Sequence, residues 1–227
     1  MMEMKSHKVT KNMIAYLDQT SAAAESYRAL RTNLQFASID KKIKTIVITS
    51  PGVAEGKTAT SCNLAITMAN VGCKVLLIDA DLRKPAVHKE FKLSNKLGLV
   101  NLLMNEAEFD KALQVFSDIP NLTILTSGTM PPNPAEIIAS TKMKELLEYF
   151  SSNYDYVIID SPPAGYVSES AILANLADGT ILTISAGETN IALAKQVTRM
   201  LKNVGVNILG VVMTKLSIDK HNFYQYY

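Results

Sequence analysis

The stretch ITSPGVAEGKTAT, residues 48–60, guides the interpretation of the whole chain. It follows a short apolar run and leads into residues 58–72, where apolar side chains recur three and four apart, so it joins a strand to a helix. Within it, Gly56, Lys57 and Thr58 form a Gly-Lys-Thr triplet. Backbone N–H groups at a helix start, together with the helix dipole, attract anions. The stretch is therefore typical of a loop that holds the phosphates of a nucleotide.

The loop departs from the usual spacing of glycine, four residues and Gly-Lys-Ser/Thr, because Pro51 stands where the first glycine is expected and Gly52 follows it. In such a loop Lys57 is expected to reach the β- and γ-phosphates, and the Thr58 hydroxyl is expected to bind magnesium. Gly-Lys-Thr alone is common by chance. An ordinary polar turn between a strand and a helix is the alternative, and the motifs described below disfavour it.

Apolar runs of strand length alternate with longer stretches of helical period, which predicts an α/β fold with a mostly parallel sheet and helices on both faces. The runs are continuous in Val, Ile and Leu, so the strands are expected to be buried on both faces. The expected strands are residues 44–50, 74–80, 122–127, 156–161, 179–186 and 208–214, and the clearest helices are residues 21–38, 58–72, 168–178 and 190–205.

Composition limits the possible partners. The chain has 227 residues, of which 48% are hydrophobic, and this predicts a single domain over residues 1–227. Lys and Arg number 23 and Asp and Glu number 21, so the formal charge is only +2. Because nucleic-acid binders usually carry a clear basic excess, no nucleic-acid partner is expected.

The sequence also indicates a soluble, intracellular protein. No apolar run approaches the roughly 20 residues that a membrane-spanning helix needs, and the N-terminus has no apolar segment after its charges. Cys62 and Cys73 form neither a CxxC pair nor a disulfide framework, and they are interpreted as packing residues in a reducing cytosol.

Two further strands are expected to end in acids. Asp79 and Asp81 lie in KVLLIDADLRKP, and Asp160 lies in YVIIDSPPAG. Ligands of open parallel sheets collect at the carboxyl ends of the strands, so these carboxylates are expected near one magnesium-phosphate centre. Each acid taken singly is equally well explained as a helix cap or turn residue. Three of them beside Gly-Lys-Thr are hard to explain in that way.

Taken together, Gly-Lys-Thr, LLIDADLRKP (residues 76–85) and VIIDSPP (residues 157–163) resemble the Walker A, A′ and B motifs of bacterial tyrosine kinases, the cytoplasmic kinases of capsule and exopolysaccharide synthesis. ESYRALR (residues 25–31) fits the ExxRxxR signature of that family, and GTMPPNPAEII (residues 128–138) resembles its GxxPPNPxEL segment. The resemblance covers nearly the whole chain and implies a P-loop NTPase fold. The HRD and DFG signatures of eukaryotic protein kinases are absent from the sequence.

The resemblance implies ATP and Mg²⁺ as cofactors and assigns roles to particular residues. Lys57, Asp79, Asp81 and Asp160 are the expected catalytic residues, with Asp79 as the base that accepts the tyrosine proton. Thr58, Asp81 and Asp160 are the expected magnesium ligands. The expected nucleotide contacts are Gly52, Val53, Ala54, Glu55, Gly56, Lys57, Thr58, Ala59 and Arg83.

Two loop residues differ from the family pattern, which is close to Pro-Gly-Glu-Gly-Lys-Ser. Val53 replaces its proline and Ala54 replaces its penultimate glycine. If the backbone at Ala54 needs a positive φ, alanine costs roughly 1 kcal/mol there. A loss of about tenfold in affinity, from this strain together with crowding of a phosphate by the Cβ, still permits nucleotide binding at cellular ATP concentrations.

The chain ends in a tyrosine-rich tail, residues 221–227, which contains Tyr224, Tyr226 and Tyr227. These three are the expected phosphoacceptors because the resemblance implies autophosphorylation of a neighbouring subunit's tail. The alternative is that the aromatic side chains dock on the protein's own surface. Tail phosphorylation favours a kinase over the second candidate function, a switch or assembly ATPase of the partition type.

Position 52 also separates these two functions, because partition ATPases carry a signature lysine where this chain has Gly52. At the other end of the expected site, Thr214 stands where relatives often have the asparagine of the adenine pocket. Lys215 is interpreted either as a base contact or as a charged cap.

The resemblance also implies partners and a location. The helix at about residues 21–38 is expected to join copies of the chain into a ring through Glu25, Arg28 and Arg31. Pairing within the helix is the simpler explanation of these three residues. A separate membrane protein is expected to activate the kinase through its cytoplasmic tail, and a protein tyrosine phosphatase is expected to reverse it. The kinase would then be cytoplasmic and peripheral to the inner face of the membrane.

Overall fold

The computed structural model describes residues 9–38 and 42–216. Within them a seven-stranded sheet has the order β3-β4-β2-β5-β1-β6-β7, and every neighbouring pair is parallel except β3 with β4. The strands are β1 (Thr45–Thr49), β2 (Val75–Asp79), β3 (Leu113–Val115), β4 (Leu122–Leu125), β5 (Tyr156–Asp160), β6 (Gly179–Ser185) and β7 (Ile208–Thr214). The mostly parallel sheet confirms the predicted fold class.

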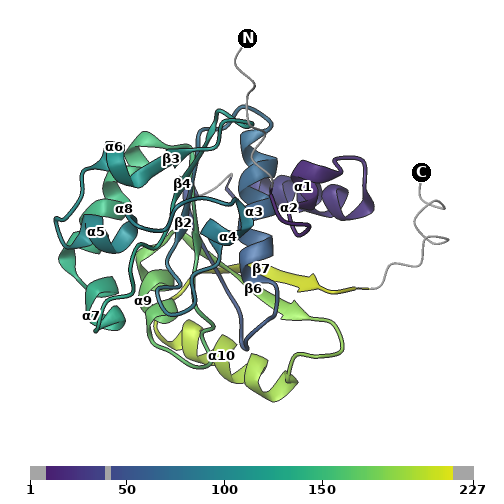
Figure 1. Cartoon of the computed structure of the whole chain (residues 1–227). Coiled ribbons are helices and arrows are strands. Elements are labelled where there is room, and N and C mark those ends of the chain that lie inside the picture. Colours follow the sequence, from purple (N-terminus) through teal and green to yellow (C-terminus); the bar gives the residue numbers. More distant parts are fainter. Residues whose placement is uncertain (1–8, 39–41, 217–227) are drawn as a thin grey trace, which may run out of the picture.

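Helices cover both faces of this sheet. In Figure 1, α1, α2 and α3 lie on one side, and α5, α7 and α8 lie on the other. The helices are α1 (Ile14–Leu17), α2 (Ala22–Ala37), α3 (Lys57–Ala69), α4 (Val87–Glu90), α5 (Leu99–Leu103), α6 (Phe109–Ala112), α7 (Pro134–Ile138), α8 (Thr141–Asn153), α9 (Glu169–Leu176) and α10 (Ile191–Asn203). None of the helices in the described residues is long and apolar enough to cross a membrane.

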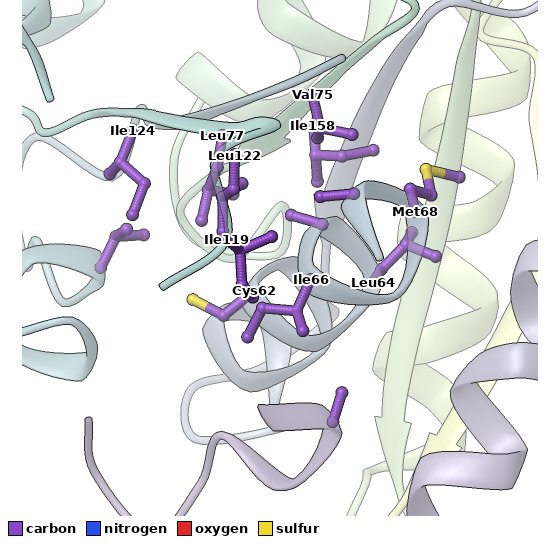
Figure 2. Packing of buried hydrophobic residues seen from close by; sticks show 14 of the residues in the cluster. Cys62, Leu64, Ile66, Met68, Val75, Leu77, Ile119, Leu122, Ile124 and Ile158 are labelled. Carbon is purple, nitrogen blue, oxygen red and sulfur yellow. The ribbon is translucent and has the colours of Figure 1, made fainter. Parts of the chain in front are cut away.

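Helix α3 lies against the centre of the sheet, which fixes the loop that precedes it. Figure 2 shows Leu64, Ile66 and Met68 of this helix packed with Leu77 and Ile158 of the sheet. These side chains are 0% exposed. Burying a large aliphatic side chain contributes about 1.5–3 kcal/mol, so the packing holds the N-terminus of α3 firmly against the strands.

The strand register brings the predicted acids together. Strands β2 and β5 are neighbours, and their register pairs Asp79 with Asp160. Strand β1, which leads into the loop, lies on the other side of β5, with Ile48 opposite Asp160. Because the carboxyl ends of parallel strands lie at the same end of the sheet, the loop and the two acids lie together at that end.

All six predicted strands are present, but the prediction that they are buried on both faces is wrong for β7. This strand forms the edge of the sheet, and Val211 and Met213 are 58% and 50% exposed. An apolar run does not distinguish a central strand from an edge strand, because that difference depends on which strands pair. The short antiparallel β3 was not predicted, and neither were α1, α4, α5, α6, α7 and α8.

The predicted helices begin and end within a few residues of the observed ones. Two of the predicted ranges end at Gly72 and Gly205, which have φ of 90° and 80° and follow α3 and α10. Glycine adopts this left-handed conformation without the steric cost that a Cβ imposes, so these glycines suit the turns in which both helices stop.

Candidate active site

The Gly-Lys-Thr loop leads directly into α3, which begins at Lys57. Gly56 precedes it with φ 83°, and a Cβ built at this position would lie 2.9 Å from Thr214 Cγ2. Glycine is therefore required here both by the backbone conformation and by the close approach of β7. No side chain caps the helix N-terminus. Its first N–H groups are thus available for an anionic ligand.

Ala54 has a positive φ of 58°, so the strained backbone considered for this position in the sequence is present. An L-residue in this region costs roughly 1 kcal/mol or more because its Cβ approaches the following carbonyl oxygen. The loop therefore keeps a glycine-like shape although it carries alanine.

A cleft of about 800 Å³ opens over the loop and the start of α3. Its wall includes loop residues expected to contact the nucleotide, namely Val53, Ala54, Gly56, Lys57, Thr58 and Ala59. Lys57 is only 9% exposed, so its ammonium group lies in a partly desolvated position at the helix start. A cation there is well suited to offset phosphate charge.

Asp160 joins the end of β5 to α3. Its Oδ2 accepts a hydrogen bond from Thr58 Oγ1 at 2.6 Å, and its Oδ1 accepts one from Ser61 Oγ at 3.1 Å. Burial raises the pKa of Asp160 to about 6, although the two hydroxyls and Lys57 favour its charged form. Ser61 was not predicted, yet it lies three residues after Thr58 on the same helix, so helical spacing could have identified it.

Asp79 is fully buried at the end of β2. Its Oδ2 accepts hydrogen bonds from the N–H groups of Ala86 and Val87, both at 3.0 Å, at the start of α4. Its Oδ1 is buried and has no hydrogen-bond partner within the described residues. Burial first, and then the charge of Asp160, raise the pKa of Asp79 well above its ordinary value.

Asp81 lies just beyond β2 and, unlike Asp79, lines the cleft. Its Oδ1 accepts a hydrogen bond from the N–H of Lys84 at 2.9 Å, and the side chain of Lys84 lines the same cleft. The two acids of the DAD segment therefore lie at different depths. Asp81 faces the ligand space, whereas Asp79 lies beneath it.

The residues at this edge fit a magnesium ion shared with a nucleotide. Across the described part of the chain, no three His, Cys, Asp or Glu side chains form a group that could hold a metal. Mg²⁺ at nucleotide sites takes only one or two protein oxygens, with phosphates and waters supplying the rest. The Thr58 hydroxyl and the carboxylates of Asp81 and Asp160 are oxygen donors of this type, and the buried Asp79 Oδ1 is a further oxygen without a hydrogen-bond partner in the described structure.

Arg83 lies apart from the loop residues. Its Nε and Nη2 lie 2.8 Å and 2.7 Å from Glu169 Oε1, and Glu169 is 2% exposed at the start of α9. Arg83 is not among the described residues that line the cleft. Its contact with a nucleotide stays a prediction, and Glu169 is a partner that no local sequence signal indicated.

The predicted oligomerisation residues lie on α2. Arg28 Nη2 lies 2.5 Å from Glu25 Oε2, so these two form the ion pair expected from helical spacing. Arg31 Nε is buried and has no hydrogen-bond partner among the residues described. Tyr27, between them in sequence, lines the cleft, and burial raises its pKa. No local sequence pattern indicated that Tyr27 lies in the cleft.

Thr214 and Lys215, considered as adenine contacts, both line the cleft. Lys215 Nζ pairs with Glu188 Oε2 at 2.5 Å on the surface. Asn12 and Glu90 line the same cleft, and they join through an Asn12 Nδ2 hydrogen bond to Glu90 Oε1 of 2.9 Å. The three expected phosphoacceptor tyrosines lie outside the described residues.

The loop at the start of α3 and the acids at the ends of parallel strands define a P-loop NTPase. Residues 42–210 match a family model described as an AAA domain. The Bacillus subtilis tyrosine-protein kinase YwqD is 43% identical over 220 residues, which cover 97% of this chain and 92% of that protein.

Two solved structures agree with this match. The chimerical protein CapA2B2 has a TM-score of 0.88 and 32% identity, with 92% of each chain covered. The kinase domain of the Escherichia coli tyrosine kinase ETK has a TM-score of 0.85 and 33% identity, covering 96% of this chain and 87% of that one. The chain belongs to the family of bacterial tyrosine-protein kinases, which are P-loop enzymes.

Proposed function

We propose that the chain transfers the γ-phosphoryl group of ATP to tyrosines in its own C-terminal cluster, acting on a neighbouring copy, and thereby regulates capsule or exopolysaccharide synthesis. The acceptors are Tyr224, Tyr226 and Tyr227. The observation that carries the proposal is the 2.6 Å hydrogen bond from Thr58 to Asp160, which joins the phosphate loop to the strand-end acids beside Lys57. The kinase names of YwqD and ETK support it.

In this mechanism the N-terminus of α3 binds the phosphates of ATP through backbone N–H groups, and Lys57 offsets charge on the transferred group. The tyrosine oxygen forms a bond to the γ-phosphorus while the bond to the bridging oxygen of ADP breaks. Mg²⁺, when bound, would neutralise phosphate charge, and Thr58, Asp81 and Asp160 are the residues proposed to hold it.

Asp79 is proposed to receive the proton of the tyrosine, although its side chain is fully buried and does not line the cleft in the described structure. Its Oδ1 has no other hydrogen-bond partner in the described structure, and burial makes this carboxylate more basic than usual. A base of higher pKa accepts a proton from a phenol more readily, and it does so late in a loose transition state. Asp81, which lines the cleft, instead organises the metal and its waters.

Mass spectrometry after incubation with ATP and Mg²⁺ tests the proposal. Phosphate should appear on Tyr224, Tyr226 and Tyr227, and the Lys57→Ala protein should show none. Transfer between copies is tested by mixing Lys57→Ala protein with an active protein that carries Tyr→Phe at all three positions. Phosphate should then appear on the inactive partner. Phosphate confined to other residues would refute the assignment of these acceptors, and ATP hydrolysis without transfer would favour a switch ATPase.

Assembly into a ring is proposed to depend on α2. Arg28 pairs with Glu25 within the helix, whereas Arg31 forms no ion pair within the described residues, and its guanidinium group is proposed to pair with an acid of a neighbouring subunit. Light scattering on Arg28→Ala and Arg31→Ala variants should show a smaller assembly than the unmodified chain forms. An unchanged mass in both variants would remove α2 from the interface.

The proposed partners are a membrane protein whose cytoplasmic tail activates the kinase and a phosphatase that reverses tail phosphorylation. The chain would then act at the inner face of the membrane without crossing it. A kinase assay with and without a peptide from a candidate activator tail tests this arrangement. Activation should raise the rate of tail phosphorylation, and an unchanged rate across candidate tails would contradict it.

A further inference from the structure

Glu55 lies inside the phosphate loop, but its side chain does not line the cleft. Its loop neighbours Ala54 and Gly56 line the cleft. Glu55 is not one of the described residues that line it, and it is 6% exposed. A carboxylate close to a triphosphate would repel it, so the side chain must be held on another side of the loop. The structure shows what holds it there.

Each carboxylate oxygen of Glu55 accepts a hydrogen bond. The N–H of Gly52 donates to Oε2 at 2.8 Å, which closes the loop on itself. The hydroxyl of Thr189 donates to Oε1 at 2.7 Å. Thr189 lies 134 residues later in the turn between β6 and α10, and its Oγ1 accepts a hydrogen bond from the N–H of Ser185 at 2.7 Å. The loop is thus fastened to a distant turn of the chain.

A second contact supports the same position of the loop. Thr214 Oγ1, at the end of β7, lies 3.1 Å from the carbonyl oxygen of Glu55 and 3.2 Å from that of Ile184 at the end of β6. Glu55 therefore meets both the turn after β6 and the end of β7. The backbone on either side of it includes the strained Ala54 and the left-handed Gly56.

We propose that Glu55 is a positioning residue that holds the phosphate loop in its binding conformation through the Glu55–Thr189 link, the hydrogen bond between these two side chains. Strained backbone persists only where the surrounding structure holds it, and this link supplies such support beside Ala54. Amide groups arranged before the ligand arrives need no rearrangement on binding, which favours tight binding. The inference rests on the nucleotide binding that the proposed function requires.

Gly52 provides an independent sign of this role. A Cβ built at Gly52 would lie 3.0 Å from Glu55 Oε1, a close contact that would make the carboxylate shift by a few tenths of an ångström. Gly52→Ala should consequently weaken nucleotide binding in the same way as removal of the carboxylate by Glu55→Ala. If both act through the Glu55–Thr189 link, the double variant should bind no more weakly than the weaker single variant.

The test compares three threonine variants in nucleotide binding and kinase assays. Thr189→Val removes the hydroxyl and keeps the shape, and it should raise the Kd for an ATP analogue and the KM for ATP about fivefold to tenfold, while kcat changes less than about twofold. Thr189→Ser keeps the hydroxyl and should restore the unmodified Kd. Thr198→Val is the matched control, because within the described residues the Thr198 hydroxyl donates only to the Ala194 carbonyl of its own helix, at 2.8 Å.

Glu55→Ala should show the same rise in Kd and KM as Thr189→Val. Unchanged values in both variants would overturn the proposal, as would a lowered melting temperature with an unchanged KM, which indicates a purely structural role. If the unmodified chain binds no nucleotide, the proposed function itself fails. If it binds and the variants bind equally well, only the positioning role fails.

Discussion

The acids at the strand ends and the acid in the phosphate loop are held by different means. Asp79 and Asp160 end neighbouring strands in register, so the sheet alone brings them together. Glu55 has no such support, and its carboxylate is held by the Gly52 N–H and by a threonine 134 residues away. The difference shows that one end of the sheet combines two acids placed by backbone pairing of strands with an acid held by hydrogen bonds to its side chain.

Asp79 also differs from the other two acids in how its oxygens are hydrogen-bonded without a ligand. Both oxygens of Glu55 and both oxygens of Asp160 accept hydrogen bonds, whereas Asp79 Oδ1 is buried without a partner in the described structure. A buried carboxylate that lacks a partner costs free energy when it ionises. The environment of Asp79 is therefore incomplete without a ligand, whereas the protein itself supplies partners for Glu55 and Asp160.

The largest effect is expected from Lys57, the buried cation at the start of α3 that favours the charged form of Asp160. Lys57→Met should lower tyrosine phosphorylation at least about 100-fold, because a charge that stabilises the transition state is lost. Lys89→Met in α4 is the control, since Lys89 is exposed and lies outside the described lining of the cleft. The measurement is the initial rate of phosphate incorporation, and unaltered turnover in Lys57→Met would overturn the site.

Asp79→Asn tests whether the buried strand-end acid acts in chemistry. Phosphate transfer should fall about 100-fold, the range of general acid-base catalysis, while the Kd for an ATP analogue stays within about threefold. Asp81→Asn should instead weaken metal-dependent nucleotide binding, because Asp81 lines the cleft. Equal losses of binding and transfer in Asp79→Asn would assign Asp79 to the metal.

The raised pKa of Asp160 predicts how stability depends on pH. Because burial raises this pKa to about 6, the native state binds a proton more tightly than the unfolded state does. Its stabilising contribution is present below the ordinary pKa of 3.8 and is lost as the pH rises through about 6.

Asp160→Asn should consequently stabilise the nucleotide-free protein at about pH 8 by up to about 3 kcal/mol, with the gain vanishing near pH 4. Urea unfolding in the presence of EDTA measures this difference. Asp155→Asn, at an exposed acid beside the start of β5, controls for the loss of one negative charge. A gain that does not depend on pH would contradict the explanation by burial.

The smallest effect is expected at Ala54, where the loop backbone is strained. Ala54→Gly should lower the Kd for an ATP analogue by up to about tenfold and change stability by less than about 1 kcal/mol, since relief of strain is offset by greater freedom of the unfolded chain. Lys92→Gly is the control because Lys92 also has a positive φ, 50°, but lies outside the described cleft lining. It should leave the Kd unchanged.

The sequence could predict the six main strands because each contains a short apolar run, and such a run is a local pattern. It could not predict which strands lie at the edge, so the exposure of Val211 and Met213 on β7 was missed. It identified Lys57, Thr58 and Asp160 as neighbours because a loop and a strand end are local features. It did not indicate Glu169 as the partner of Arg83 or Thr189 as the partner of Glu55, since those pairs depend on how distant segments pack.

By itself, the amino-acid sequence determined the class of fold, the phosphate loop and the strand ends that carry acids, because periodicity and short motifs act over a few residues. Only the tertiary structure decided that Asp79 lies beneath the cleft while Asp81 faces it, and that the Glu55 carboxylate turns toward Thr189. The direction of a side chain at these positions follows from burial and from hydrogen-bond partners far along the chain, which no local pattern contains.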